Sequence, residues 1–240
     1  MRIAVEAREL SLSLGGRQLL RNLDLRLELG SLVALRGANG AGKSTLLNCL
    51  AGLLRPTAGE IFWFGQPRSM RASPSIPIGY VSHESFLYPE LTARENLLFV
   101  GRMLGVARLE SRVQAWIERI DLVGAARRPV ERLSRGMRQR LSIARALLHD
   151  PPLVLMDEPF SDLDDGSRAW LMQLLQQLRK NHCAILYSSH HDEQCSPLAN
   201  RIVRLFDGRL QPDRLPAQAG SAAPLFPMPP PIERGRRFAS

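Results

Sequence analysis

The sequence predicts an α/β fold with a mainly parallel sheet, an antiparallel β sub-sheet at the N-terminus and an inserted α-helical sub-domain. Short apolar runs at 32–35, 153–156 and 184–187 are typical of strands buried in a parallel sheet. Leucines alternate with other residues over 10–29, which indicates antiparallel strands. Between residues 84 and 148 the apolar positions recur instead at the 3.6-residue period of helices.

Length and composition set outer limits on the fold. The chain has 240 residues, 45% hydrophobic and 23% charged, which is ordinary for a globular protein with a full core. We expect one domain over residues 1–211, with the helical sub-domain at about 84–148. Residues 212–240 are rich in proline and polar side chains, so we expect them to form a disordered C-terminal tail.

The apolar runs and the cysteines indicate the cellular compartment of the chain. No apolar run approaches the ~18 residues that span a bilayer, and Glu6 and Glu9 interrupt any signal-peptide core. The three cysteines, Cys49, Cys183 and Cys195, are odd in number and lack C-x-x-C spacing. They fit a reducing cytoplasm better than a disulfide framework, so we expect a cytoplasmic chain.

The net charge of +9 would suit a nucleic-acid partner. The arginines are scattered, however, and no basic stretch is interleaved with aromatic residues. Only Lys43 and Lys180 are lysines among the 32 basic residues, which indicates a general preference for arginine. We therefore expect no nucleic-acid partner, with attraction to an anionic membrane surface as the alternative reason for the charge.

The N-terminal part is predicted to be mostly β-structure. Alternating leucines at 10–14 and 23–29 flank Gly15-Gly16 and predict a β-hairpin. The elements expected next are a buried strand at 32–35, a helix at 46–51 stopped by Gly52, a strand at 60–64 ended by Gly65-Gln66-Pro67, a basic surface loop at 67–77 and a strand at 78–81.

The middle of the chain is predicted to be helical. Thr92-Ala93-Arg94-Glu95 forms a capping box, the pattern that begins a helix. One apolar face of a second helix is made by Val113, Trp116, Ile117 and Ile120. A third helix at 137–148 ends before Asp150-Pro151-Pro152.

The C-terminal part alternates strands and a helix again. A strand at 153–156 precedes a helix marked by leucines up to 178, and Arg179 and Lys180 suit the dipole at its C-terminus. A third buried strand follows at 184–187, and Asp207-Gly208 predicts a hairpin between the last two strands.

The most informative motif follows the strand at 32–35. It fits G-x-x-x-x-G-K-[ST], the phosphate-binding loop (P-loop) of nucleoside triphosphatases (NTPases), and the strand–loop–helix context is the one this motif requires. Lys43 would reach the β- and γ-phosphates, and the Ser44 hydroxyl would bind Mg²⁺. The predicted nucleotide-binding residues here are Gly37, Ala38, Asn39, Gly40, Ala41, Gly42, Lys43, Ser44 and Thr45.

An acidic pair stands at the end of the strand at 153–156. Asp157 directly follows four apolar residues, so its carboxylate lies at the strand's C-terminal end, where it can hold Mg²⁺ through water. Glu158 can accept a proton from an attacking water, which makes it the predicted general base. The pattern therefore predicts a P-loop NTPase core that hydrolyses a nucleoside triphosphate with Mg²⁺.

The run Leu133-Ser134-Arg135-Gly136-Met137-Arg138-Gln139-Arg140 resembles the signature sequence of ATP-binding cassette (ABC) proteins, a resemblance that covers nearly all of residues 1–210. It implies a two-lobed ATPase that works as a head-to-tail dimer. Ser134 and Gly136 would then contact the γ-phosphate held by the partner's loop. Residues 161–164 resemble the D-loop that crosses the dimer, and His190 resembles the histidine that senses the γ-phosphate, a catalytic role.

Three features, at four positions, depart from the usual pattern of that family. Leu14 occupies the place of the aromatic residue that stacks on adenine, and His83 occupies that of the glutamine in the catalytic glutamine loop. The signature carries Arg135 and Met137 where Gly and Gln are most frequent. With Glu90–Leu97 and Asp157-Glu158-Pro159-Phe160, the first two departures resemble the ATP-binding subunit of heme exporters in cytochrome c maturation.

The resemblance implies a peripheral ATPase at the cytoplasmic face of the inner or plasma membrane, which binds ATP and Mg²⁺ and powers separate integral membrane transporter subunits. It would pair with an identical or a different cassette. The alternatives are an exporter ATPase for a drug, lipid, polysaccharide or ion, and an ABC protein acting on ribosomes or DNA. A metal or heme site is a further alternative for the His/Cys-rich stretch His182, Cys183, His190, His191 and Cys195, but its spacing matches no known site.

Overall fold

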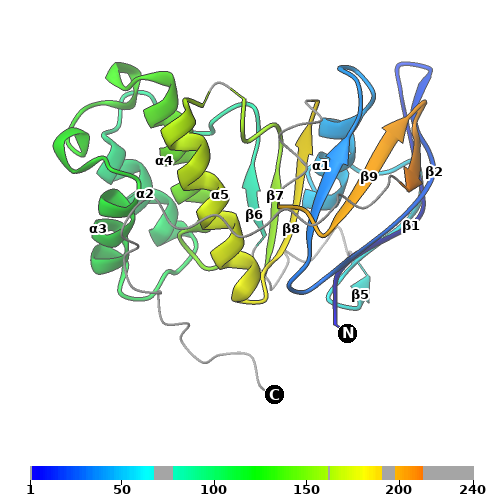
Figure 1. The fold of residues 1–240 in the computed structure, drawn as a ribbon, viewed down its shortest axis with the longest axis horizontal. Helices are drawn as coiled ribbons and strands as arrows, with labels where there is room; N and C mark the ends of the chain where they lie inside the picture. The colour runs from blue at the N-terminus through cyan, green and yellow to red at the C-terminus, as the bar shows by residue number, and fades with distance from the viewer. Residues whose placement is uncertain (1, 68–77, 162, 191–197, 213–240) are drawn as a thin grey trace.

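The computed structural model describes residues 2–67, 78–161, 163–190 and 198–212. Most of the expected surface loop at 67–77 and of the expected tail at 212–240 lies outside these residues, as do Asp162, His191 and Cys195. The remaining elements form two sheets and five α-helices within the described ranges (Figure 1).

The predicted N-terminal hairpin belongs to a four-stranded antiparallel sheet. Strands β1 (Ile3–Leu14) and β2 (Arg17–Glu28) pair as expected, and β4 (Ala58–Trp63) joins the other edge of β1. Strand β4 ends before Gly65 as predicted, but the sequence did not predict β5 (Gln66–Pro67), which pairs back onto β4 through a tight turn at Phe64 (φ 52°) and Gly65 (φ 80°). A turn with two successive left-handed residues is of type I′, whose backbone twist matches the right-handed twist of the two strands that it joins.

The second sheet has six strands in the order β10-β9-β3-β8-β7-β6 and is parallel except at β10. The predicted buried strands lie at its centre. Its strands are β3 (Leu32–Arg36), β6 (Gly79–Val81), β7 (Leu153–Met156), β8 (Ala184–Ser189), β9 (Arg201–Phe206) and β10 (Arg209–Pro212). The carboxyl ends of the parallel strands therefore meet at one edge, where ligands bind in open α/β sheets.

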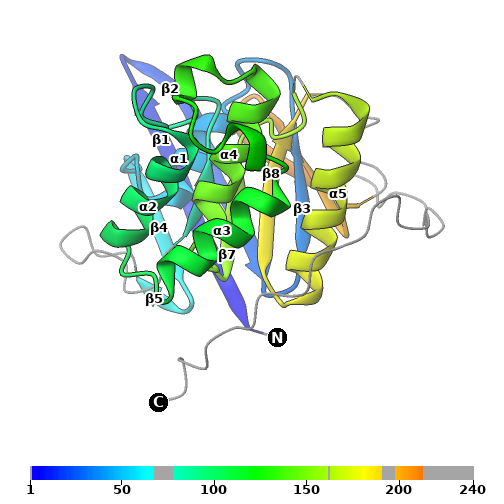
Figure 2. The same ribbon diagram turned by 90° about the vertical axis from the view of Figure 1, so that its left-hand side faces the viewer.

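Five α-helices surround this sheet: α1 (Lys43–Ala51), α2 (Ala93–Met103), α3 (Leu109–Arg119), α4 (Arg135–Leu147) and α5 (Asp165–Lys180). The 3₁₀ turns η1 (Val123–Ala125) and η2 (Val130–Arg132) connect α3 to α4. Helices α2, α3 and α4 gather at one end of the molecule (Figures 1 and 2). The predicted capping box is present at α2, since Glu95 N donates to Thr92 Oγ1 and Thr92 N donates to Glu95 Oε2 at 2.8 Å.

Two hydrophobic cores lie on opposite faces of the six-stranded sheet. Alternate residues of one strand enter different cores: Leu32 and Ala34 of β3 pack with α2–α5, whereas Val33 and Leu35 pack with α1 and the four-stranded sheet. This two-sided burial is why the central strands are apolar throughout. Within the described parts of the chain, no helix combines the length and apolar character needed to cross a bilayer.

Candidate active site

The predicted phosphate-binding loop joins β3 to α1 at the carboxyl edge of the six-stranded sheet. Gly42 caps α1 in a left-handed conformation (φ 100°, ψ 13°), which favours glycine. A Cβ atom on Gly37 would lie 2.7 Å from the carbonyl oxygen of Leu205, so the end of β9 leaves no room for a side chain there. The loop is thereby held with the N-terminus of α1 open to an anion, as phosphate binding requires.

Lys43 is nearly buried in this loop, with 6% of its surface exposed. Its Nζ donates to the carbonyl oxygens of Gly37 at 2.8 Å and Ala38 at 3.3 Å, and lies 3.3 Å from Glu158 Oε1. A buried ammonium needs such partners because burial without them is costly. The side chain therefore carries its charge at the point where a bound triphosphate would lie.

The acidic pair is fixed by the neighbouring strands. Asp157, 4% exposed, donates its backbone N–H to Val81 O of β6 at 2.8 Å. Ser188 at the end of β8 links the pair, because its hydroxyl donates to Asp157 Oδ1 at 2.6 Å and accepts from Glu158 N at 2.8 Å. The Asp157 carboxylate is thus oriented before any ligand arrives.

Glu158 lies between two cationic or potentially cationic groups. Its Oε1 faces Lys43, and its Oε2 lies 2.8 Å from His190 Nδ1. The backbone of Glu158 is left-handed (φ 48°), an uncommon state for a residue with a side chain. Strain of this kind concentrates at functional sites and here turns the carboxylate toward the phosphate loop.

One pocket of about 380 Å³ brings most predicted site residues together. It is lined by Leu19, Asn39, Gly40, Gly42, Lys43, Ser44, Thr45, His83, Asp157, Glu158, Ser161 and His190. The catalytic candidates His83, Glu158 and His190 therefore face the phosphate loop from three separate loops. Ser44 and Asp157 supply oxygen ligands of the kind that Mg²⁺ prefers, with space left for water, so the residues present fit that ion.

Five predicted site residues do not line this pocket: Gly37, Ala38 and Ala41 of the phosphate loop, and Ser134 and Gly136 of α4. Ser134 caps α4, where its Oγ accepts from Met137 N at 3.3 Å, and Gly136 lies in the first turn of the same helix. The expected action of Ser134 and Gly136 on a partner chain stays a prediction. Among the described residues no group of three His, Cys, Asp or Glu is placed to hold a metal ion, and His191 and Cys195 of the His/Cys-rich stretch lie outside those residues.

Sequence reasoning missed two residues that shape the pocket. Met156 of β7 pairs with Tyr187 of β8, so the next residues of the two strands, Asp157 and Ser188, lie side by side. The sequence signal that could have identified Ser188 is a polar residue near the end of the strand next to the acidic pair. Tyr80 donates its hydroxyl to Asn48 Oδ1 of α1 at 2.6 Å. Burial raises the pKa of Tyr80 above its usual range, and the charge of Asp157 adds to this rise, so the phenol stays neutral and remains a donor.

Comparison with known proteins places these features in context. A family model described as ABC transporter matches residues 20–161. The sulfate/thiosulfate import ATP-binding protein of Synechococcus elongatus is 34% identical over 95% of this chain, which spans only 65% of that relative's length. The ABC transporter ATP-binding protein NatA of Bacillus subtilis is 36% identical over 79% of each chain. A lantibiotic transport ATP-binding protein of Streptococcus pyogenes is 34% identical over 86% of this chain and 88% of its own.

Solved structures show the same likeness. A dimeric ATP-binding cassette in a post-hydrolysis state, bound to ADP and Pi, superimposes with a TM-score of 0.78 at 27% identity, covering 88% of this chain and 99% of that one. The ATP-binding subunit of an ABC transporter superimposes with a TM-score of 0.80 at 28% identity, over 86% of this chain and 88% of that one.

Proposed function

This chain belongs to the ABC transporter family as one of its ATPase cassettes, and from this we propose that it powers an exporter whose membrane-spanning subunits are separate chains. The observation that carries the ATPase part of the proposal is the convergence of Lys43, Asp157, Glu158 and His190 on the phosphate loop. The relatives' names include a sulfate/thiosulfate import protein and a lantibiotic transport protein, so the direction of transport is the finer part of this proposal.

We propose a role for each of these side chains in ATP hydrolysis. The loop amides, the α1 N-terminus and Lys43 bind the phosphates, while Ser44 and Asp157 would hold Mg²⁺, which supplies charge neutralisation at the β- and γ-phosphate oxygens. Glu158 accepts the proton of the attacking water. His190, in contact with Glu158, and His83, which also lines the pocket, orient the γ-phosphate and that water.

We propose that two cassettes close over the nucleotide. Ser134 and Gly136 would complete the site of a partner cassette, since both lie at an open helix N-terminus, outside the pocket of their own chain. The solved neighbours include dimeric cassettes, which supports this arrangement.

We propose further that the membrane subunits dock beside His83 and the Glu84–Pro89 loop, which places the cassette at the cytoplasmic face of the membrane. This loop carries two exposed aromatic residues, Phe86 at 50% and Tyr88 at 45%. It is anchored to α2, because Tyr88 N donates to Asn96 Oδ1 at 2.8 Å, and Asn96 Nδ2 donates back to Tyr88 O at 3.0 Å. A membrane subunit bound at this loop can therefore affect the nucleotide pocket through His83 and the helices through the contact of Tyr88 with α2.

The docking proposal predicts that a cross-linker placed at Phe86 captures an integral membrane protein. Charge reversal at Glu84 or Glu90 should weaken the stimulation of ATPase activity by that protein and leave basal activity intact, because both side chains lie outside the nucleotide pocket. Charge reversal at the exposed Glu118 of α3 serves as the control. Cross-links that never reach a membrane protein would contradict the transporter proposal.

Heme is the substrate we propose within this class, on the resemblance carried by His83, Leu14 and the segments around Glu90 and Asp157. The purified membrane complex should then show a heme absorption band, and a deletion strain should lack mature c-type cytochromes. Normal c-type cytochromes in that strain would exclude heme and leave a drug, lipid, polysaccharide or ion as the exported substrate.

Nucleotide selectivity should be loose, because Leu14, which is 48% exposed, replaces the aromatic side chain that stacks on adenine. Base stacking contributes about 1–3 kcal/mol per base where an aromatic is present. We expect the ratio of kcat/KM for ATP over GTP to stay below roughly one hundredfold (~2.7 kcal/mol), and Leu14→Tyr to tighten the binding of both nucleotides. Leu53→Tyr, at another exposed leucine, is the control. A ratio above that limit would mean that another residue recognises the base.

A further inference from the structure

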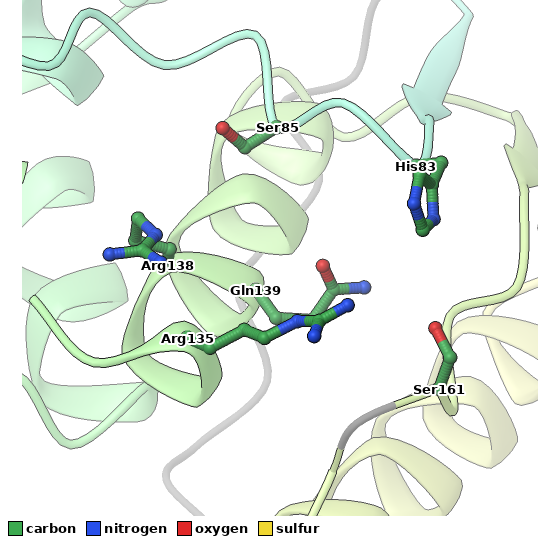
Figure 3. Close-up of a pocket in the computed structure, with 6 residues that line it drawn as sticks. All are labelled: His83, Ser85, Arg135, Arg138, Gln139 and Ser161. Carbon is green, nitrogen blue, oxygen red and sulfur yellow. The ribbon is translucent and has the colours of Figure 1, made fainter.

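A second hollow, of about 200 Å³, adjoins the nucleotide pocket. It is lined by His83, Ser85, Arg135, Arg138, Gln139 and Ser161, which come from the segment after β6, from the first half of α4 and from the segment after Glu158 (Figure 3). We propose that this hollow is a binding site for one inorganic phosphate ion and that it receives the phosphate cleaved from ATP in the adjoining nucleotide pocket. The identity of the source, but not the site itself, rests on the proposed ATPase function.

The charge of the lining determines the class of ligand. Arg135 and Arg138 carry permanent positive charges, and none of the six lining residues is acidic. In Figure 3 the Arg135 side chain extends toward His83 and Ser161, whereas the Arg138 guanidinium lies on the other side of Gln139 and donates to Leu133 O. An anion in the hollow would therefore be bound by the Arg135 guanidinium, and the charge of Arg138 would add to the attraction at longer range. Guanidinium groups bind the oxygens of phosphate through paired, charge-assisted hydrogen bonds, which favours a tetrahedral oxyanion.

The walls of the hollow are held in place by hydrogen bonds to the backbone. Arg138 Nη1 donates to Leu133 O at 2.6 Å, and Ser142 Oγ donates to Ser85 O at 3.1 Å. On the opposite wall, Ser161 Oγ donates to Glu158 O at 2.7 Å. A site built before its ligand arrives loses less conformational freedom on binding.

The size of the hollow favours a small ion. At roughly 30 Å³ for each water molecule, about 200 Å³ holds one tetrahedral oxyanion and a few waters. Pockets for larger organic ligands usually measure about 300–1,000 Å³ and are mainly apolar. The polar, cationic lining therefore fits inorganic phosphate better than a second nucleotide.

The two pockets share a wall, which connects the proposed site to the reaction. His83 and Ser161 line both hollows, and in Figure 3 the Arg135 side chain extends past Gln139 toward the side where these two residues lie. Phosphate leaving the γ-position would pass His83 and Ser161 and meet Arg135. Its release into solution should then be slower than ATP cleavage.

Binding of free phosphate tests the site without ATP. Inorganic phosphate is titrated by calorimetry into the full chain carrying Lys43→Ala, which disables phosphate binding at the P-loop. We expect a dissociation constant in the millimolar range that survives in this background and weakens about tenfold or more with Arg135→Gln, the effect of losing a charge-assisted hydrogen bond. Arg138→Gln should weaken binding less, because its guanidinium acts at longer range. Arg128→Gln removes the same charge from an exposed position outside the hollow and should change nothing.

Phosphate formed by the enzyme tests the proposed source. In a single turnover of the otherwise unaltered chain, release measured with a fluorescent phosphate sensor should lag cleavage measured by acid quench. Arg135→Gln should shorten this lag, and Arg128→Gln should preserve it. Loss of binding in the Lys43→Ala chain, or unchanged affinity in both pocket variants, overturns the site. If the chain binds phosphate but shows no lag, the claim that the hollow receives phosphate from ATP cleavage is wrong. If the chain cleaves no ATP, the proposed function is contradicted, and the calorimetric titration alone decides whether the hollow binds phosphate.

Discussion

Glu158→Gln is expected to lower the rate of ATP hydrolysis by about 10²–10⁴, the usual effect of losing a general base, and to leave ATP bound. Glutamine keeps the shape of the side chain and can still hold water, but it cannot take up the proton. Phosphate binding depends on other groups, the loop amides, Lys43 and Ser44. The substitution also removes the carboxylate that lies 3.3 Å from Lys43 Nζ, which leaves the ammonium more available to the triphosphate.

The same variant should accumulate as a dimer in the presence of Mg-ATP, because ATP enclosed between two cassettes has no exit by hydrolysis. Size-exclusion chromatography and a phosphate-release assay measure the two effects together. Glu60→Gln, at an exposed position of β4 in the other sheet, is the matched control. Normal turnover by Glu158→Gln would remove Glu158 from its catalytic role. A monomer loaded with ATP would preserve that role and favour a different cassette as partner.

Much of the fold followed from the sequence because local and tertiary preferences agree. The central strands are buried on both faces and hence apolar throughout, and they occur where these runs predicted them. Thr92 and Glu95 form both capping bonds that their spacing implied. Strand β5 was missed because Gln66-Pro67 carries no strand pattern, and its pairing depends on backbone angles at Phe64 and Gly65.

The candidate site was predictable in its residue types and not in its connections. The motif spacing identified Lys43, Asp157 and Glu158, and strand topology brings them to one edge of the sheet. Ser188, which bonds to both acidic residues, belongs to a strand whose register only the folded chain defines. The hollow beside His83 likewise joins α4 to two distant segments, so no local pattern could reveal it.

Ser134→Arg, added to the Glu158→Gln chain, is expected to abolish the ATP-dependent dimer. Ser134 lies at the exposed N-terminus of α4, where its hydroxyl and the nearby amides would meet the partner's γ-phosphate. Arginine removes that hydroxyl and introduces a long side chain into the dimer interface, which closes around the γ-phosphate. Losing the cap costs only about 0.5–2 kcal/mol of helix stability, so the fold should survive, which circular dichroism verifies.

Two further variants separate the causes of that loss. Ser134→Ala removes the hydroxyl without adding bulk and should weaken the dimer less than Ser134→Arg does. Ser111→Arg adds the same side chain at an exposed position in the first turn of α3 and should leave the dimer intact. If the chain carrying Ser134→Arg and Glu158→Gln still dimerised with ATP, the start of α4 would lie outside the dimer interface. Another surface of the partner would then have to enclose the nucleotide.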